Sequence, residues 1–131
     1  MRTIKFRGIP IDEDCEWNII TGSLLVDIFG NTIIYHPLNT NLGGFRAVPV
    51  NPETVGQFTG LTDKNGVEIY ENDIIKVDIF TKPYSVLFGK SEKWGACFCV
   101  QSFNSITFLT KNWADTCEVI GNIHDNPELL Q

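Results

Sequence analysis

The chain has 131 residues, of which 43% are apolar and 20% charged, and its formal net charge at pH 7 is −6. Ten basic residues against sixteen acidic ones argue against nucleic-acid binding, which draws much of its affinity from Lys and Arg on phosphates. No apolar run approaches the ~20 residues that cross a bilayer, and the charged start MRTIKFRGIP does not resemble a signal peptide. We therefore expect a globular protein of the cytoplasm, without a membrane segment.

Short runs of alternating apolar and polar residues dominate the N-terminal part and predict β-strands. The first run is RTIKFRG, and the acidic stretch 12–17 that follows it has the length of a single turn. The runs SLLVDIF and NTIIY meet at Gly30 and Asn31. We interpret these two residues as a two-residue hairpin turn, because both residue types tolerate positive φ.

Residues 36–52, HPLNTNLGGFRAVPVNP, contain three prolines, a Gly pair and three asparagines. This composition is typical of a long loop, with at most one short strand from Phe45 to Val48. The loop is the best candidate for a boundary inside the chain. We therefore predict a β-rich N-terminal part over residues 1–50, which includes most of the loop, and a β-barrel-like core over residues 51–131.

Residues 60–75, GLTDKNGVEIYENDII, combine two turn signals with two apolar alternations. Residues 63–66 (DKNG) predict a tight turn, and residues 70–73 predict a second one that leads directly into the strand DIIKVDIF. In that strand we expect three apolar side chains to share one face, namely Ile75, Val77 and Ile79. The pattern indicates that this stretch shapes a β-ribbon and holds no reacting group.

Further alternation in YSVLF, GACFCV, SITFLT and CEVIGNI brings the expected total to seven to ten short strands. Helical signals are few, and Asn126-Pro127 predicts an N-cap followed by no more than one turn. The predicted fold class is mainly β with little helix. We expect a small bent sheet or an SH3-like barrel in the C-terminal part, preceded by a β-rich N-terminal extension.

Four cysteines, at positions 15, 97, 99 and 117, raise the question of a disulfide or a zinc site. Structural zinc sites use ligand pairs two to four residues apart on tight turns. Cys97 and Cys99 instead flank Phe98 within a predicted strand, which places both thiols on one face without a zinc knuckle. Reduced thiols and no metal are the favoured interpretation.

Other catalytic and cofactor patterns are missing from the sequence or incomplete. Asp12, Asp14 and Glu16 begin like a calcium loop but lack its Gly and its final Glu. His36 and His124 show no sequence relation to a nucleophile and a carboxylate of the kind that a catalytic triad needs. No glycine-rich nucleotide-binding motif is present. We therefore assign no catalytic residue and no cofactor from the sequence.

Three segments, RTIKFRG, ETVGQFTGLTDKNGVEIYENDIIKV and EVIGNIHDNPELL, resemble the YopX family of phage and prophage proteins, in the family's order. The resemblance implies a phage-derived protein in the cytoplasm of a bacterial host and supplies no activity. It also implies that EIYENDII enters an SH3-like barrel. The family pattern reads Glu-Gly-Asp where this chain has Glu71-Asn72-Asp73. We therefore predict that Asn72 has positive φ and caps the turn, because Asn is the common substitute for Gly in a left-handed backbone.

These observations favour a noncatalytic binding module that contacts a host or phage protein through loops or an exposed strand edge. One alternative is a single-stranded nucleic-acid-binding accessory protein, in which Trp94 stacks on a base and lysines hold phosphates. The residues of this weak candidate site are Trp94, Lys90 and Lys93, with Lys82 nearby in sequence. A second alternative is a small enzyme that uses His124 or a thiol. Unpaired strand edges also leave a homo-oligomer open, without a preferred number of subunits.

Overall fold

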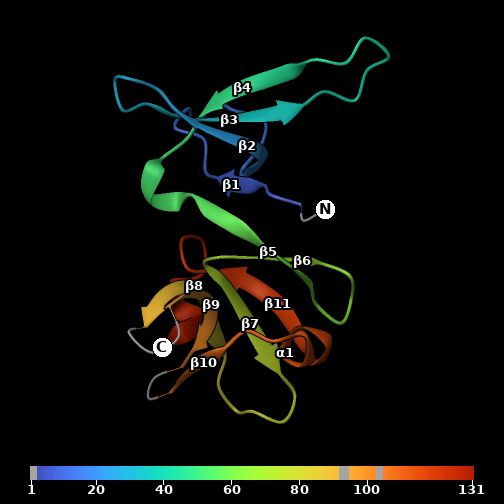
Figure 1. Cartoon of the computed structure of the whole chain (residues 1–131), viewed down its shortest axis with the longest axis vertical. Coiled ribbons are helices and arrows are strands. Elements are labelled where there is room, and N and C mark those ends of the chain that lie inside the picture. The colour runs from blue at the N-terminus through green and yellow to red at the C-terminus, as the bar shows by residue number, and fades with distance from the viewer. Residues whose placement is uncertain (1–2, 92–94, 103–104) are drawn as a thin grey trace. The chain divides into compact units, whose positions relative to one another are not determined.

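The computed structural model describes residues 3–91, 95–102 and 105–131. The chain divides into two compact units, Met1–Phe58 and Thr59–Gln131. The described residues form eleven β-strands, one six-residue α-helix and two short 3-10 helices (Figure 1). The strands pair antiparallel in two sheets, which confirms the prediction of a mainly β fold with little helix. No helix in the described part of the chain has the length and hydropathy that a membrane crossing requires.

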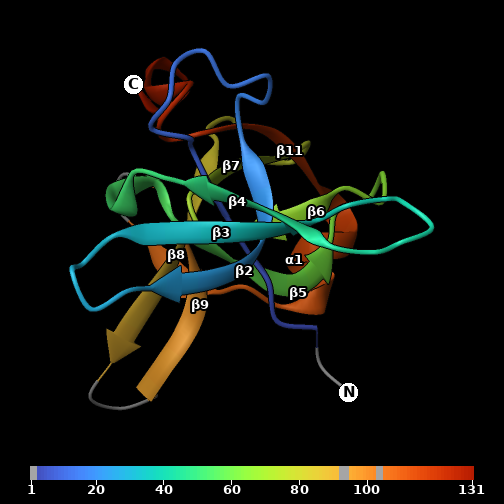
Figure 2. The same ribbon diagram turned by 90° about the horizontal axis from the view of Figure 1, so that it is seen from above.

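The N-terminal unit contains four strands of a six-stranded antiparallel sheet, in the order β4-β3-β2-β1, and the first residues of β5, which pairs with β1. Their bounds are β1 Phe6–Gly8, β2 Ile20–Val26, β3 Thr32–Pro37, β4 Phe45–Pro49 and β5 Gly56–Thr62, with the 3-10 helix η1 at Pro52–Thr54. Strand β4 agrees with the short strand predicted from Phe45 to Val48. Figure 2 shows β2, β3 and β4 from above. The core of this unit consists of four buried aliphatic side chains, Ile20, Ile34, Val48 and Val50.

The turn between β2 and β3 differs from the predicted two-residue hairpin turn. It spans residues 27–31, and the Asp27 carboxylate accepts hydrogen bonds from the backbone N–H of Phe29 and of Asn31, both at 2.9 Å. Gly30 has a φ of 84°, whereas Asn31 is not among the described residues with positive φ. The prediction was wrong because the Asp27 side chain stabilises a longer turn that needs only one left-handed residue.

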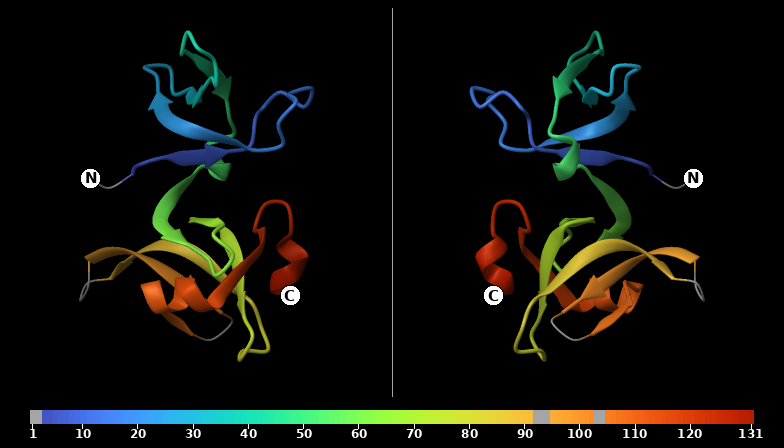
Figure 3. Two further views of the ribbon diagram at one scale, coloured as in Figure 1. Left: turned by 90° about the vertical axis from the view of Figure 1, so that its right-hand side faces the viewer. Right: turned by 90° about the vertical axis from the view of Figure 1, so that its left-hand side faces the viewer.

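The C-terminal unit contains a five-stranded antiparallel sheet in the order β10-β9-β8-β7-β11. The elements that follow β5 are β6 Glu68–Tyr70, β7 Asp73–Val77, β8 Tyr84–Ser91, β9 Gly95–Gln101, β10 Ile106–Phe108, α1 Lys111–Thr116, β11 Cys117–Asn122 and the 3-10 helix η2 Pro127–Leu130. Figure 3 shows β8 and β9 running together as a long ribbon. Strands β10 and β11 are the outer strands of this sheet in the described part, so the bent-sheet prediction holds and no closed barrel forms.

The core of the C-terminal unit is formed by apolar residues from five strands and the helix. Its buried members are Ile69, Ile75, Val77, Val86, Val100, Ala114 and Cys117. Ile75 and Val77 share the buried face as predicted, but Ile79 is 81% exposed. The prediction for Ile79 was wrong because β7 ends at Val77, where the Phe80 N–H donates to the Val77 carbonyl in a turn.

Asp63 organises the first turn of the segment 60–75, although only 5% of its surface is exposed. Its Oδ1 accepts hydrogen bonds from the N–H groups of Asn65 at 2.8 Å and Val67 at 2.9 Å. Its Oδ2 accepts from the N–H of Val119 in β11, 56 positions later, at 2.9 Å. One carboxylate thus closes a local turn and ties it to a strand that is distant in sequence.

The second turn of this segment contains Asn72, whose φ of 78° confirms the predicted left-handed conformation. The Asn72 N–H donates to the Val86 carbonyl at 2.7 Å, and its carbonyl accepts from the Ile123 N–H at 2.9 Å. Within the turn, the buried Asp73 accepts a hydrogen bond from the Tyr70 N–H at 2.7 Å. The turn is therefore anchored on two sides, which is the shaping role that the sequence predicts.

Candidate functional site

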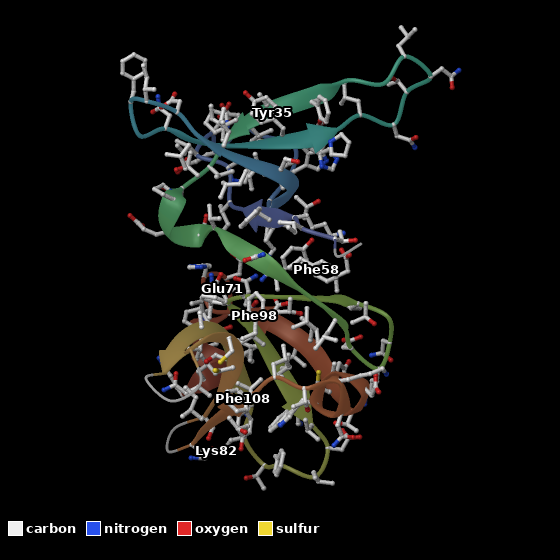
Figure 4. All side chains as sticks on the ribbon, viewed as in Figure 1. Tyr35, Phe58, Glu71, Lys82, Phe98 and Phe108 are labelled. Atoms are coloured by element: carbon white, nitrogen blue, oxygen red, sulfur yellow. The ribbon has the colours of Figure 1, made fainter. Side chains whose placement is uncertain are left out.

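Most of the predicted nucleic-acid site falls outside what the structure describes. Lys93 and Trp94 lie outside the described residues, and Lys90 is described only through its backbone in β8. Lys82, labelled in Figure 4, lines a surface hollow of about 450 Å³. The other residues around that hollow are Pro83, Ser85, Gln101, Ser102, Leu130 and Gln131. The nucleic-acid interpretation of these residues stays a prediction.

The two histidines lie in different units, and their described contacts are with residues that stabilise the fold. His36 Nδ1 lies 2.7 Å from the Thr21 carbonyl oxygen, and its ring packs against Trp17. The backbone N–H of His124 donates to the side chain of Asn122 at 3.0 Å. Its Nε2 is buried and has no hydrogen-bond partner in the described part of the chain. No described contact joins either ring to a thiol, a hydroxyl or a carboxylate.

The buried cysteine of the C-terminal core is a poor nucleophile. Cys117 is fully buried, and burial, together with the charge of Asp63, raises the pKa of its thiol to about 11. The thiol is therefore protonated at neutral pH, whereas the reactive form of cysteine is the thiolate. Its contact with the Ala114 carbonyl is consistent with a packing role.

An exposed sheet face in the N-terminal unit is the strongest candidate for a functional surface. Side chains that lie directly opposite each other on paired antiparallel strands share a face. The register pairs Leu25 with Ile33, Tyr35 with Ala47, and Pro37 with Phe45. We define the apolar face as Leu25, Ile33, Tyr35, Phe45 and Ala47. The other face of the same strands carries Ile34 and Val48 into the core.

The apolar face is open to water. Phe45 is 66% exposed and Leu25 is 44% exposed. Tyr35, labelled in Figure 4, contacts Phe45 edge-on, with their ring centroids 6.5 Å apart. Aromatic pairs of this kind supply much of the contact energy in protein interfaces. None of the five side chains that define the apolar face carries a charge.

A surface hollow of about 390 Å³ adjoins the apolar face and shares Ile33 with it. The other residues that line it are Ile11, Gly30, Asn31, Thr32, Pro49, Val50 and Pro52, none of which is charged. The hollow contains no titratable side chain for acid, base or nucleophilic chemistry. The chemistry of this region therefore suits recognition of an apolar group.

The basic residue of β4 lies on the opposite side of the sheet. The Arg46 guanidinium stacks over the Trp17 ring at 4.6 Å and pairs with Glu16 at 2.8 Å. Arg46 is opposite His36 in the register, which places it on the face of Ile34 and Val48. Its charge therefore does not belong to the apolar face.

Sequence reasoning missed the apolar face, although its signal is present. The stretches LLV in β2 and IIY in β3 are continuously apolar where alternation would place polar residues. Such runs are typical of strands buried on both faces. In this structure one of the two faces is exposed, so the excess of apolar residues marks a surface.

A protein family and a solved structure each match nearly the whole chain. The sequence model of a family described as YopX protein matches residues 5–131. Among solved structures, the chain is similar to the crystal structure of protein EF1440 from Enterococcus faecalis. The two are 25% identical, the TM-score is 0.65, and the match covers 100% of each chain. No curated protein matches the chain. The likeness therefore includes both units.

Proposed function

The chain belongs to the YopX family, and on this premise we propose that it is a noncatalytic, phage-derived module that binds a host or phage protein through the apolar face. The observation that supports this proposal most directly is the exposure of Leu25 and Phe45 beside Tyr35 on one uncharged sheet face. Contiguous exposed apolar surface in a folded protein usually marks a contact site. The bacterial cytoplasm as the place of this contact is part of the proposal.

A protein is the partner that suits this surface best. Burying apolar area contributes about 25 cal/mol per Å², so a partner that covers these side chains gains most of its affinity from the hydrophobic effect. Nucleic acid would need cations at the contact, and the apolar face offers none while the chain as a whole carries a formal charge of −6. A protein surface with its own apolar centre is therefore the matching chemistry.

The edge position of β4 adds a second means of contact. Strand β4 is the outer strand of its sheet in the described part and pairs only with β3. An outer strand offers backbone N–H and C=O groups to an extended peptide, while side chains on the adjoining face select it. Phe45 lies on this strand, so one partner segment can use both features.

The test is affinity capture from the bacterial host with the full chain and two single variants. Phe45→Ser removes the most exposed aromatic side chain of the apolar face. Ile28→Ser is the matched control, because Ile28 is 93% exposed but lies in the turn after β2, outside that face. We expect the wild type and Ile28→Ser to enrich the same protein and Phe45→Ser to lose it by at least about tenfold.

Two outcomes would contradict the proposal. Equal enrichment by the wild type and Phe45→Ser would show that the contact lies elsewhere. Light scattering gives the second outcome. If the wild type is a dimer and Phe45→Ser is a monomer, the apolar face binds a second copy of the chain instead. Circular dichroism of the variants checks that both remain folded.

A further inference from the structure

Two thiols in the C-terminal unit approach each other closely. Cys97 and Cys99 lie on one face of β9, and their Sγ atoms are 3.5 Å apart. Same-face residues on a strand are separated by about 6.7 Å, twice the rise per residue. Both side chains therefore lean toward each other along the strand. This arrangement is independent of the apolar face and of the proposed function.

The surroundings of the pair are apolar on one side and open on the other. In the register, Cys99 lies between Leu87 of β8 and Phe108 of β10, and it is 7% exposed. Cys97 is opposite Gly89, so β8 places no side chain over it. A Cβ added at Gly89 would lie 3.5 Å from Cys99 Sγ and 3.4 Å from Cδ1 of Leu87, so a Leu87 methyl group borders this side of the pair. Cys97 is only partly buried, and its sulfur is the one that a small ion can approach from water.

The strand opposes a disulfide between these residues. A disulfide needs Cβ atoms about 3.8 Å apart, far closer than same-face residues of a regular strand. To reach that separation β9 would have to bend, but it pairs with β8 along its length and with β10 at Cys99. Oxidation would therefore break backbone hydrogen bonds in the middle of the sheet.

A metal ion placed between the two sulfurs links the two side chains without bending the strand. Two metal–sulfur bonds in line, each with the length of about 2.3 Å that Zn–S bonds have, would place the sulfurs about 4.6 Å apart. That separation lies between the 3.5 Å of the free pair and the spacing of the two Cβ atoms.

The number of ligands selects the ion. The described residues hold no group of three or more His, Cys, Asp or Glu side chains placed to bind a metal. Zn²⁺ takes four ligands, whereas soft thiolates alone suit Cu⁺. We propose that Cys97 and Cys99 form a two-coordinate site for a soft monovalent ion, Cu⁺, in which both sulfurs bind as thiolates.

Binding releases protons and no electrons. One Cu⁺ and two thiols give a bis-thiolate complex with one negative charge and two protons in solution, so no oxidant is needed.

The test is an anaerobic titration of the full chain with Cu⁺ against a chromophoric Cu⁺ chelator. We expect one equivalent for the wild type and for Cys15→Ser, whose thiol lies in the other unit. Cys97→Ser and Cys99→Ser should each bind at least about 100-fold more weakly. Cys97→Ser is decisive because Cys97 is only partly buried and its loss leaves the core intact.

Three results would overturn the proposal. The first is no Cu⁺ equivalent on the wild type, and the second is an undiminished equivalent on a folded Cys97→Ser variant. The third is a disulfide between Cys97 and Cys99, detected by mass spectrometry after incubation with glutathione disulfide, because it would show that the strand does bend. Circular dichroism of each variant establishes that it is folded before the titration.

Discussion

At the level of single residues, Asn72 holds a backbone conformation that few L-residues adopt, with a φ of 78°. Its backbone N–H and C=O bind Val86 and Ile123, so the conformation also positions two hydrogen bonds. The left-handed region costs most L-residues about 1–2 kcal/mol, while Asn and Gly tolerate it. The residue type at position 72 therefore affects the stability of the fold through its backbone conformation.

We expect Asn72→Ala to lower the free energy of unfolding by about 1 kcal/mol and Asn72→Gly to change it by only a few tenths. Asn65→Ala is the control, because Asn65 also lies in a turn but is not among the described residues with positive φ. Urea denaturation measures all three variants. Equal losses for Asn72→Ala and Asn72→Gly would contradict the backbone argument.

Asp63 predicts a pH dependence of stability. Burial raises the pKa of its carboxyl, but the hydrogen bonds from Val119, Val67 and Asn65 outweigh burial and hold the pKa below its usual range. A carboxyl with a lowered folded-state pKa stabilises the fold above its unfolded value, about 3.9, and loses this contribution as the pH falls through the folded-state pKa. Stability should therefore fall as the pH drops below about 5.

We expect Asp63→Asn to lower the free energy of unfolding at pH 7 by at least about 2 kcal/mol, because its NH₂ group must face a backbone N–H. The variant should also lose part of the stability decrease between pH 5 and pH 3. Urea denaturation at pH 7, pH 5 and pH 3 measures the free energy of unfolding of the variant and of the wild type. Asp78→Asn is the control, since its side chain is 86% exposed. An unchanged pH profile in Asp63→Asn would assign the acid sensitivity to other groups.

At the level of elements, the close contact of β2 with β3 depends on Gly22. A Cβ at this position would overlap the Tyr35 carbonyl oxygen of β3. We expect Gly22→Ala to lower the free energy of unfolding by at least about 2 kcal/mol, because backbone atoms must move apart. Gly30→Ala should cost only about 1 kcal/mol, because nothing lies near its Cβ and only its φ of 84° opposes the change.

Denaturation followed by circular dichroism separates these two glycines. A Gly22→Ala variant as stable as Gly30→Ala would mean that β2 and β3 can separate slightly at no cost. Such a result would also weaken the definition of the apolar face, since that face depends on the same register.

The sequence predicted those elements whose cause is local. Asn72 was predictable because a left-handed turn position accepts few residue types, and the strand from Phe45 because alternation marks it within a proline-rich loop. Helix α1 was not predicted, since its six residues are too few for a helical stripe of apolar side chains. The local signals are weak: Thr110 caps the first turn, and Lys111 pairs with Asp115 at i,i+4 spacing.

The apolar face and the thiol pair depend on contacts that a sequence does not contain. Alternation shows that Leu25 and Ile33 can share a face, but not whether another layer covers them. The shared face of Cys97 and Cys99 was predictable from their spacing, whereas the lean of their sulfurs to 3.5 Å was not. The opposition of Gly89 to Cys97 required the register of β8 and β9.

At the level of the whole molecule, each unit has its own core. Every residue assigned to the N-terminal core precedes residue 59, and every residue assigned to the C-terminal core follows it. A cavity in one core should therefore weaken mainly that unit. Large-to-small changes at buried isoleucines cost about 2–5 kcal/mol.

We expect Ile34→Ala to reduce amide hydrogen-exchange protection in β2 and β3 while protection in β7, β8 and β9 changes little. Ile75→Ala is the reciprocal variant, because both isoleucines are fully buried. Exchange measured by NMR reports each strand separately. Equal loss of protection in both units for either variant would show that they unfold as one cooperative body.

The order of strands in the C-terminal sheet constrains when this sheet can form during synthesis on the ribosome. Strand β7 lies between β8 and β11, and β11 comes after all the other strands of this sheet in the described sequence. While residues 117–122 are still inside the exit tunnel, the nascent β7 has one unpaired edge and Asp63 lacks its bond from Val119. The first turn can close early through Asn65 and Val67, but the sheet is completed only after residues 117–122 have left the tunnel.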